Sequence, residues 1–242
     1  HRLWEIDREV RAGYGTYDFH GLFRTLHDFC ANDLSAFYFD IRKDCLYCDP
    51  AGSLGRRAAR TVLDELFSCL TAWLAPILCF TAEEAWMVRK SDGGDSVHLR
   101  QFPEVQESWR DDVLAEKWRK VANVRRVVLG ALEIERVEKR IGSSLQAAPH
   151  VYLTANYLDA LEGLDVADLA IVSSIHLHKG AAPDGAFHLP ELDGIGVVPA
   201  LADGEKCDRC WKIMPDVGSD PAAPEICGRC AIAVQHYLAA AE

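Results

Sequence analysis

Four cysteines near the end of the sequence have the types and spacing that most clearly indicate chemistry. They form the array C-x₂-C-x₁₆-C-x₂-C, made by Cys207, Cys210, Cys227 and Cys230. Each C-x₂-C pair is typical of a knuckle, a tight turn that directs two sulfurs at one point, and two knuckles supply the four thiolates of a tetrahedral zinc ion. We therefore expect one structural Zn²⁺ that stabilises a small, loop-rich unit. A site closed by four thiolates has no open position for catalysis.

Other interpretations of these cysteines stay open. They could form two disulfides or remain reduced structural thiols, although nine cysteines is an odd number for a fully paired secreted protein. A thiol redox function is a further rival, but no thioredoxin-like βαβ pattern surrounds the pairs. Cys45 and Cys48 form a third C-x₂-C with no second pair nearby, so we expect ordinary thiols there.

Composition indicates a globular, cytoplasmic protein. Apolar residues make up 49% of the 242 positions and charged residues 26%, which excludes a disordered chain. No apolar run approaches the ~20 residues that span a bilayer, so we expect no membrane contact. The net charge of −11 argues against a general nucleic-acid binder. Residues 117–140 nevertheless carry eight basic and three acidic residues, a local excess of five positive charges.

Three long amphipathic patterns position these groups. Apolar residues recur every three or four positions in 17–48, 54–75 and 108–140, which predicts long helices, and a shorter helix is expected from 81. Short connections between long helices favour an antiparallel helix bundle. We assign this bundle to residues 1–141.

The pattern changes after Gly142. Residues 150–154, 170–178 and 195–198 read as strands, and 156–161 reads as a short helix. We therefore expect a small α/β domain over 142–204 and a zinc-binding ribbon or knuckle module over 205–242. The expected fold class is mainly α.

Basic residues gather around the break between the first two long helices. Arg42 and Lys43 end the first helix, where cations suit the helix dipole. Arg56, Arg57 and Arg60 begin the second, where cations oppose it. We therefore expect this group to contact phosphates or bases. The alternative is an ordinary solvated helix end.

The knuckles carry further candidates. Arg209 and Arg229 occupy the same position in the two C-x₂-C pairs. They could offset the negative charge of a four-thiolate zinc centre by hydrogen bonding, or reach phosphates. Trp211 follows the first knuckle and either packs against a neighbouring domain or stacks on a base.

The sequence shows no catalytic motif. A Gly-rich phosphate loop, a G-x-S-x-G elbow and H-E-x-x-H are all absent. His176 and His178 alternate on an expected strand and would share a face, but such pairs are usually surface residues. We therefore predict no catalytic residue in this chain.

Several segments resemble one known family, the bacterial isoleucyl-tRNA synthetases. Residues 37–44 (FYFDIRKD), 73–78 (WLAPIL) and 80–86 (FTAEEAW) resemble the anticodon-binding bundle of these enzymes, and 139–145 (KRIGSSL) resembles the segment after it. Residues 207–211 (CDRCW) and 225–230 (EICGRC) are similar to their zinc module. The bundle motifs alone would also suit the valine and leucine enzymes, and the cysteine array favours isoleucine.

The resemblance implies the C-terminal part of a cytoplasmic class I synthetase that joins isoleucine to its tRNA with ATP. ATP and Mg²⁺ would bind only in upstream catalytic domains absent from this chain, which would itself be non-catalytic. Expected partners are the anticodon stem-loop of isoleucine tRNA and the upstream catalytic and editing domains, in a monomer. One departure is Cys45, where relatives tend to carry a basic residue. The rival is a zinc-stabilised protein-interaction module without RNA binding.

The residues that we expect to bind tRNA come from three regions of the chain. They are Arg42, Lys43, Arg56, Arg57, Arg60, Lys139, Arg140, Arg209, Trp211 and Arg229.

Overall fold

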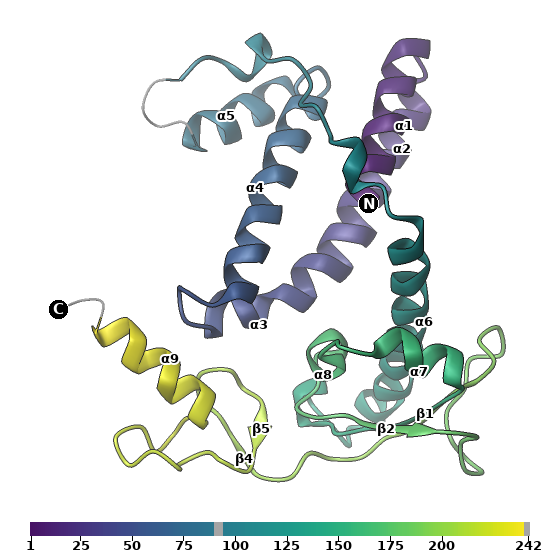
Figure 1. Cartoon of the computed structure of the whole chain (residues 1–242), viewed down its shortest axis with the longest axis vertical. Coiled ribbons are helices and arrows are strands. Elements are labelled where there is room, and N and C mark those ends of the chain that lie inside the picture. The colour runs from purple at the N-terminus through teal and green to yellow at the C-terminus, as the bar shows by residue number, and fades with distance from the viewer. Residues whose placement is uncertain (90–93, 240–242) are drawn as a thin grey trace. The chain divides into compact units, whose positions relative to one another are not determined.

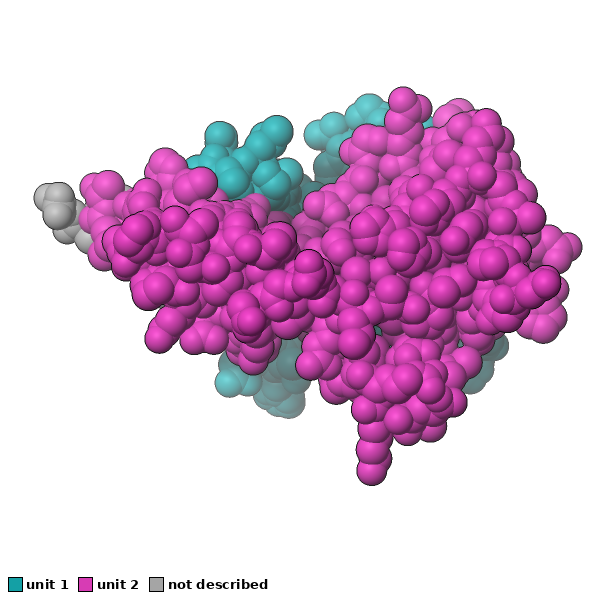
Figure 2. Space-filling view, turned by 90° about the horizontal axis from the view of Figure 1, so that it is seen from below, with its two compact units in different colours: residues 1–40, 52–112 teal, residues 41–51, 113–242 magenta. Residues whose placement is uncertain are grey.

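The computed structural model describes residues 1–89 and 94–239, and the fold is mainly α with a small sheet, as expected (Figure 1). The described residues form two compact units, coloured separately in Figure 2. The first unit contains His1–Asp40 and Gly52–Asp112, and the second contains Ile41–Ala51 and Val113–Glu242. The second unit thus takes in two segments that the sequence assigns to the bundle, 41–51 and 113–141. The domain ranges 1–141, 142–204 and 205–242 remain a prediction.

The first unit is helical. Its main elements are α1 (Arg2–Thr16), α2 (Phe19–Asp28), α4 (Leu54–Leu74) and α5 (Cys79–Arg89). One buried cluster joins α1, α2 and α4, with Ile6, Leu26 and Trp73 among its members. The Tyr14 hydroxyl donates a hydrogen bond of 2.6 Å to the carbonyl of Trp73. These contacts hold α4 in place. The first turns of α4 carry the basic residues that the sequence analysis singled out.

The long helix predicted over 17–48 differs from a single α-helix. It consists of α2, the π-helix Phe29–Phe39 and α3 (Asp40–Cys48). The buried side chains step from Phe29 to Leu34, a spacing of five that suits the wider π turn. The α-helical period predicted Cys30 in this stripe, and Cys30 is only half-buried. The π-helix therefore shifts the apolar face before α3 begins.

The second unit contains a small mixed sheet. Its strands are β1 (His150–Leu153), β2 (His176–Lys179) and β3 (Ile195–Val198), in the order β2-β1-β3. β1 pairs with β2 in parallel and with β3 antiparallel. Val151 and Leu153 are buried on one face, while His150 and Tyr152 alternate with them.

Helices complete this part of the second unit. α6 (Asp112–Val137) carries polar contacts to α7 (Ala155–Leu161) and α8 (Val166–Ala170). The strand predicted over 170–178 is wrong in its first half, because Ala170 ends α8 and only His176–Lys179 pairs with β1. Ile171, with φ of 55°, caps α8 in the left-handed conformation, and this turn prevents an extended strand there.

The C-terminal module consists of a short hairpin and a helix. β4 (Glu205–Lys206) pairs antiparallel with β5 (Ile213–Met214), and α9 (Gly228–Ala239) follows the second knuckle. Gly204 is required before the hairpin, because its φ is 116° and a Cβ there would lie 2.4 Å from the Met214 carbonyl carbon. This geometry turns the chain into the first knuckle.

Candidate zinc centre and basic surfaces

The four cysteines of the array converge on one point. Their Sγ atoms all lie within 4.8 Å of one another, and all four residues are buried. Sulfurs bound to one zinc at about 2.3 Å lie roughly 3.8 Å apart, and Cys210 and Cys227 have a sulfur–sulfur distance of 3.9 Å. All nine cysteines lie among the described residues and are free thiols. The donor set therefore fits one tetrahedral Zn²⁺, and the disulfide interpretation is not supported.

Local backbone hydrogen bonds shape both knuckles. The Cys207 amide donates to the Lys212 carbonyl at 2.9 Å, and the Trp211 amide donates to the Cys207 carbonyl at 2.8 Å. Trp211 has a φ of 65°, so the chain reverses at the residue that follows Cys210. In the second knuckle, the Asp216 carboxylate accepts the Gly228 amide at 3.0 Å, which caps the first turn of α9.

The environment of Cys207 favours a thiolate. Burial raises the pKa of the Cys207 thiol, but hydrogen bonds from the backbone amides of Cys210, Cys227 and Arg209 outweigh it and lower that pKa to about 6. A metal ligand must be the thiolate. The amide donors therefore prepare this sulfur for a cation despite its burial.

Arg209 of the first knuckle forms hydrogen bonds with the end of α3. Its Nη1 donates to the Cys48 carbonyl at 2.6 Å and its Nη2 donates to the Tyr47 carbonyl at 3.2 Å. The same Nη1 lies 3.6 Å from the Cys230 sulfur. The last carbonyls of a helix lack partners within the helix. Arg209 therefore satisfies two of them while it faces the cysteine cluster.

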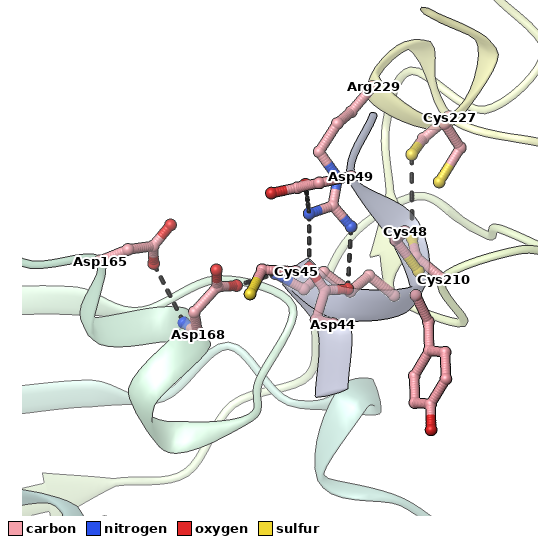
Figure 3. Close-up of polar contacts among 12 residues, drawn as sticks. Asp44, Cys45, Cys48, Asp49, Asp165, Asp168, Cys210, Cys227 and Arg229 are labelled. Carbon is pink, nitrogen blue, oxygen red and sulfur yellow. Dashed lines mark hydrogen bonds and ion pairs between the residues drawn. The ribbon is translucent and has the colours of Figure 1, made fainter. Parts of the chain in front are cut away.

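Arg229 of the second knuckle binds the same helix through a carboxylate. Its Nη2 donates to Asp44 Oδ1 at 2.9 Å, its Nη1 also binds Asp44, and Asp49 Oδ1 lies 3.6 Å away (Figure 3). The hydrogen bonds that Arg229 donates to Asp44 raise the pKa of Arg229. Burial opposes ionisation of Asp44, but Arg229 outweighs it and lowers the pKa of Asp44. Both knuckle arginines thus contact α3, and we call these contacts the α3 clasp.

Cys48 completes the packing beneath the clasp. It is buried in the same cluster as the four cysteines of the array, and its sulfur lies 3.9 Å from the Arg209 carbonyl. We expected Cys48 to be an ordinary thiol, and it lies outside the group of four possible metal ligands. Sequence reasoning missed its place beside the centre, because its spacing from Cys207 carries no motif.

The zinc module also binds the α/β part of the second unit. Lys212 forms an ion pair with Asp168 of α8, and the Ile213 amide donates to the Ser173 hydroxyl at 2.7 Å. Burial lowers the pKa of Lys212, but the Asp168 hydrogen bond outweighs it and raises that pKa. Trp211, next to Lys212, is 62% exposed and has Lys206 5.9 Å from its ring centroid.

The predicted basic residues at the helix break fall in different units. Arg42 and Lys43 lie on the segment of α3 held by the clasp, with Lys43 exposed. Arg56, Arg57 and Arg60 lie on α4, which Ser53 caps by accepting the Arg56 amide.

A groove of about 630 Å³ runs along α4 and α5 in the first unit. It is lined by Arg57, Arg60, Thr61, Leu63, Asp64, Phe67 and Arg89. Arg89 forms an ion pair of 2.7 Å with Asp64, so three cations face a single carboxylate. The sequence reasoning missed Arg89 because only the tertiary packing of α5 on α4 brings it beside Arg57 and Arg60. Phe67 lies on α4 itself, on the same face as Arg60, so its helical spacing could have identified it.

Lys139 and Arg140 follow the end of α6. Lys139 has a φ of 59°, and the Arg140 amide donates to the Glu135 carbonyl at 2.9 Å. The Arg140 side chain binds Glu135 and Glu138. Both residues are exposed.

Within the described residues, no helix combines the length and the apolar character needed to cross a membrane.

Comparison with known proteins gives two family matches in this chain. Residues 1–152 match the family described as the anticodon-binding domain of tRNA ligase. Residues 204–232 match a zinc finger found in FPG and IleRS. The second match contains all four cysteines of the array.

Three proteins similar to this chain have the same name. The chain is 55% identical over 240 residues to an isoleucine–tRNA ligase of Brucella abortus, 51% to one of Agrobacterium fabrum, and 49% over 236 residues to one of Bartonella henselae. These alignments cover 99%, 99% and 97% of this chain. The chain spans about a quarter of the length of these curated relatives (25%, 25% and 24%). The match over residues 1–152 places this chain in the family of anticodon-binding domains of tRNA ligases.

Proposed function

We propose that this chain is the anticodon-binding and zinc-binding part of an isoleucine–tRNA ligase, and that it binds the anticodon stem-loop of isoleucine tRNA. The observation that carries the proposal is the union, in one chain, of an anticodon-binding match with a zinc finger of the isoleucine enzymes. Relatives aligned over nearly all of the chain bear that enzyme's name. The activity that joins isoleucine to tRNA, with its ATP and Mg²⁺, belongs to the whole cytoplasmic, monomeric enzyme, and upstream catalytic and editing domains supply it.

The basic groups suit such a ligand despite the net charge of −11. Arg57, Arg60 and Arg89 line one groove with a single opposing carboxylate, which favours a phosphate backbone. Phe67 lies in the same groove and offers an apolar ring. Unpaired anticodon bases can be stacked on such rings and read at their edges. Arg56, Lys139 and Arg140 are further phosphate contacts in this proposal.

The zinc centre acts in this function as a positioning device. Arg209 and Arg229 are hydrogen-bonded to α3, the helix that carries Arg42 and Lys43. We infer that the metal fixes the knuckles and that the knuckles fix the end of α3 where these two cations lie. Trp211 of the zinc module remains exposed and would stack on a base.

The test is binding of the zinc-loaded chain to labelled anticodon stem-loops at one fixed, moderate salt concentration. We expect the isoleucine stem-loop to bind at least tenfold more tightly than an unrelated stem-loop of equal length. We also expect the affinity to fall steeply with added salt, because each phosphate contact releases counterions. Equal affinity for both stem-loops would remove anticodon reading.

A zinc-stabilised protein-interaction module is the second candidate. The stretch 159–205 has nine acidic residues and only Lys179 as a base, which would repel RNA and suit a basic protein. Absence of RNA binding at low salt, with zinc bound and the fold intact, would favour this candidate.

A further inference from the structure

The outer face of the small sheet carries a continuous stack of four rings. Centroids lie 4.7 Å apart for His150 and His176, 5.2 Å for His150 and His178, and 4.7 Å for Tyr152 and His178. The three pairs are inclined by only 20–23°. Strand register explains the stack, because parallel pairing sets His150 opposite His176 and Tyr152 opposite His178. We call these residues the ring stack.

The accessible chemistry of the ring stack lies at the ring edges. Neighbouring rings cover one another's faces, so an incoming nucleobase finds few free faces to stack on. His176 is exposed and the other three residues are half-buried. The edges carry the imidazole nitrogens, which donate or accept hydrogen bonds or bind metals.

Two of these nitrogens already face each other. His150 Nδ1 lies 2.9 Å from His178 Nε2. Two nitrogens bound at right angles to one metal, at about 2.1 Å each, lie roughly 3.0 Å apart, and tetragonal sites of nitrogen and oxygen ligands suit Cu²⁺ and Ni²⁺. A tetrahedral ion would need a wider spacing of about 3.3 Å. The observed separation of the two nitrogens is therefore close to that of the right-angled geometry.

A metal ion can take the place of the proton that lies between the two facing nitrogens. The proton between the two facing nitrogens can move to the other nitrogen of its ring.

We propose that His150 and His178 form a second metal site, separate from the four cysteines, that binds a divalent ion of the Ni²⁺ and Cu²⁺ class. Water completes the coordination. His176, whose ring lies beside that of His150, is an auxiliary ligand that reaches the ion by rotating its side chain. The site does not depend on tRNA binding.

The experiment uses the zinc-loaded chain without an affinity tag and Ni²⁺ as the probe. Calorimetry at pH 7.5 gives the stoichiometry, and NMR of the imidazole nitrogens locates the paramagnetic ion. We expect one Ni²⁺ per chain beyond the zinc, with His150 and His178 signals broadening first. His150→Phe and His178→Phe keep a ring in the stack but remove the ligand atoms, so each should weaken Ni²⁺ binding at least tenfold.

Two controls make the outcome decisive. His188→Phe changes a histidine of the same unit whose Nδ1 is bonded to the Ile195 carbonyl, and it should leave the Ni²⁺ affinity within twofold. His176→Ala should weaken binding by less than the two ligand variants. Unchanged affinity in both His150→Phe and His178→Phe, with zinc content and circular dichroism as in the parent, would overturn the proposal. So would broadening that begins at other histidines.

Discussion

Arg229, in the second zinc knuckle, holds Asp44 of α3 with two hydrogen bonds across 185 residues of sequence. The Asp44 side chain is 21% exposed and the Arg229 side chain 38% exposed. The exposure of the pair is therefore intermediate between that of a surface ion pair and that of a buried one. Arg209 adds hydrogen bonds to the carbonyls of Tyr47 and Cys48. One arginine from each knuckle therefore contacts the last two turns of one helix.

Breaking the Asp44–Arg229 pair should destabilise the second unit. We expect Asp44→Asn or Arg229→Gln to lower the free energy of unfolding by about 1–3 kcal/mol, because each leaves a half-buried polar partner incompletely paired. The double variant should cost less than the sum of the two, with a coupling of about 1 kcal/mol. Urea unfolding of the zinc-loaded protein measures both. The matched control is the exposed pair of Arg126 and Glu191. The same double-mutant cycle on this pair should give a coupling energy of less than about 0.5 kcal/mol.

Zinc removal should unfold the knuckles and release α3. The four buried thiols then lose their shared cation, and the small module has few other buried residues to hold it. Treatment with a strong chelator should release about one zinc per chain and should raise hydrogen exchange in 205–232 and 41–48. Cys227→Ser should prevent zinc binding, whereas Cys79→Ser, at an exposed cysteine, should not. Unchanged exchange in 41–48 after zinc loss would show that the clasp does not need the metal.

Gly204→Ala should weaken the zinc module. A Cβ at this position would lie 2.4 Å from Met214 backbone atoms, and the φ of 116° is strained for any other residue. We expect a loss of roughly 1–3 kcal/mol in the unfolding of the zinc-loaded module and a lower zinc affinity in competition with a coloured chelator. Gly52→Ala is the control, because a Cβ there meets nothing within 4 Å. Equal behaviour of the two variants would contradict the steric argument.

The groove arginines should contribute to RNA affinity without base preference. If Arg60 contacts a phosphate, Arg60→Ala should weaken stem-loop binding several-fold for every sequence and reduce the slope of log K against log salt by about 1. Arg119→Ala, at an exposed arginine of α6 that pairs with Glu116, is the comparison. A loss in Arg60→Ala confined to one stem-loop sequence would instead indicate base reading by Arg60.

The ring stack should make stability depend on pH near neutrality. The folded-state pKa of His150 lies below its unfolded value of about 6.5, so the unfolded chain binds the proton more tightly. The stabilisation is then present above about pH 6.5 and is lost as the pH falls toward the folded-state pKa. We expect the melting temperature to fall less between pH 7.5 and 5.5 in His150→Phe than in the parent protein. Identical slopes in the two proteins would contradict this prediction.

Sequence patterns predicted the parts that depend on local spacing. The C-x₂-C pairs predicted the four cysteines that converge on one point, and β1 and β3 lie where their residues indicated. The predicted strand over 170–178 failed at its start, because a left-handed cap at Ile171 depends on how α8 packs. The π-helix also escaped prediction, since Phe29 and Leu34 fit an α-helical stripe only approximately.

Long-range partners could not be read from the sequence. Two roles were left open for Arg209 and Arg229, because their spacing within the knuckles says nothing about Asp44 or Cys48. The histidine pattern gave only a shared face for His176 and His178. The third ring, His150, comes from another strand and appears only through the parallel register of β1 and β2.

The α3 clasp imposes an order on synthesis. A ribosome that adds ~5–20 residues per second makes Asp44 roughly 9–37 s before Arg229, which follows 185 residues later. During that interval, the last turns of α3 have neither of their knuckle arginines. Maturation of this helix end therefore waits for synthesis of the second knuckle and for the supply of zinc, so zinc starvation should first affect newly made chains rather than those already folded.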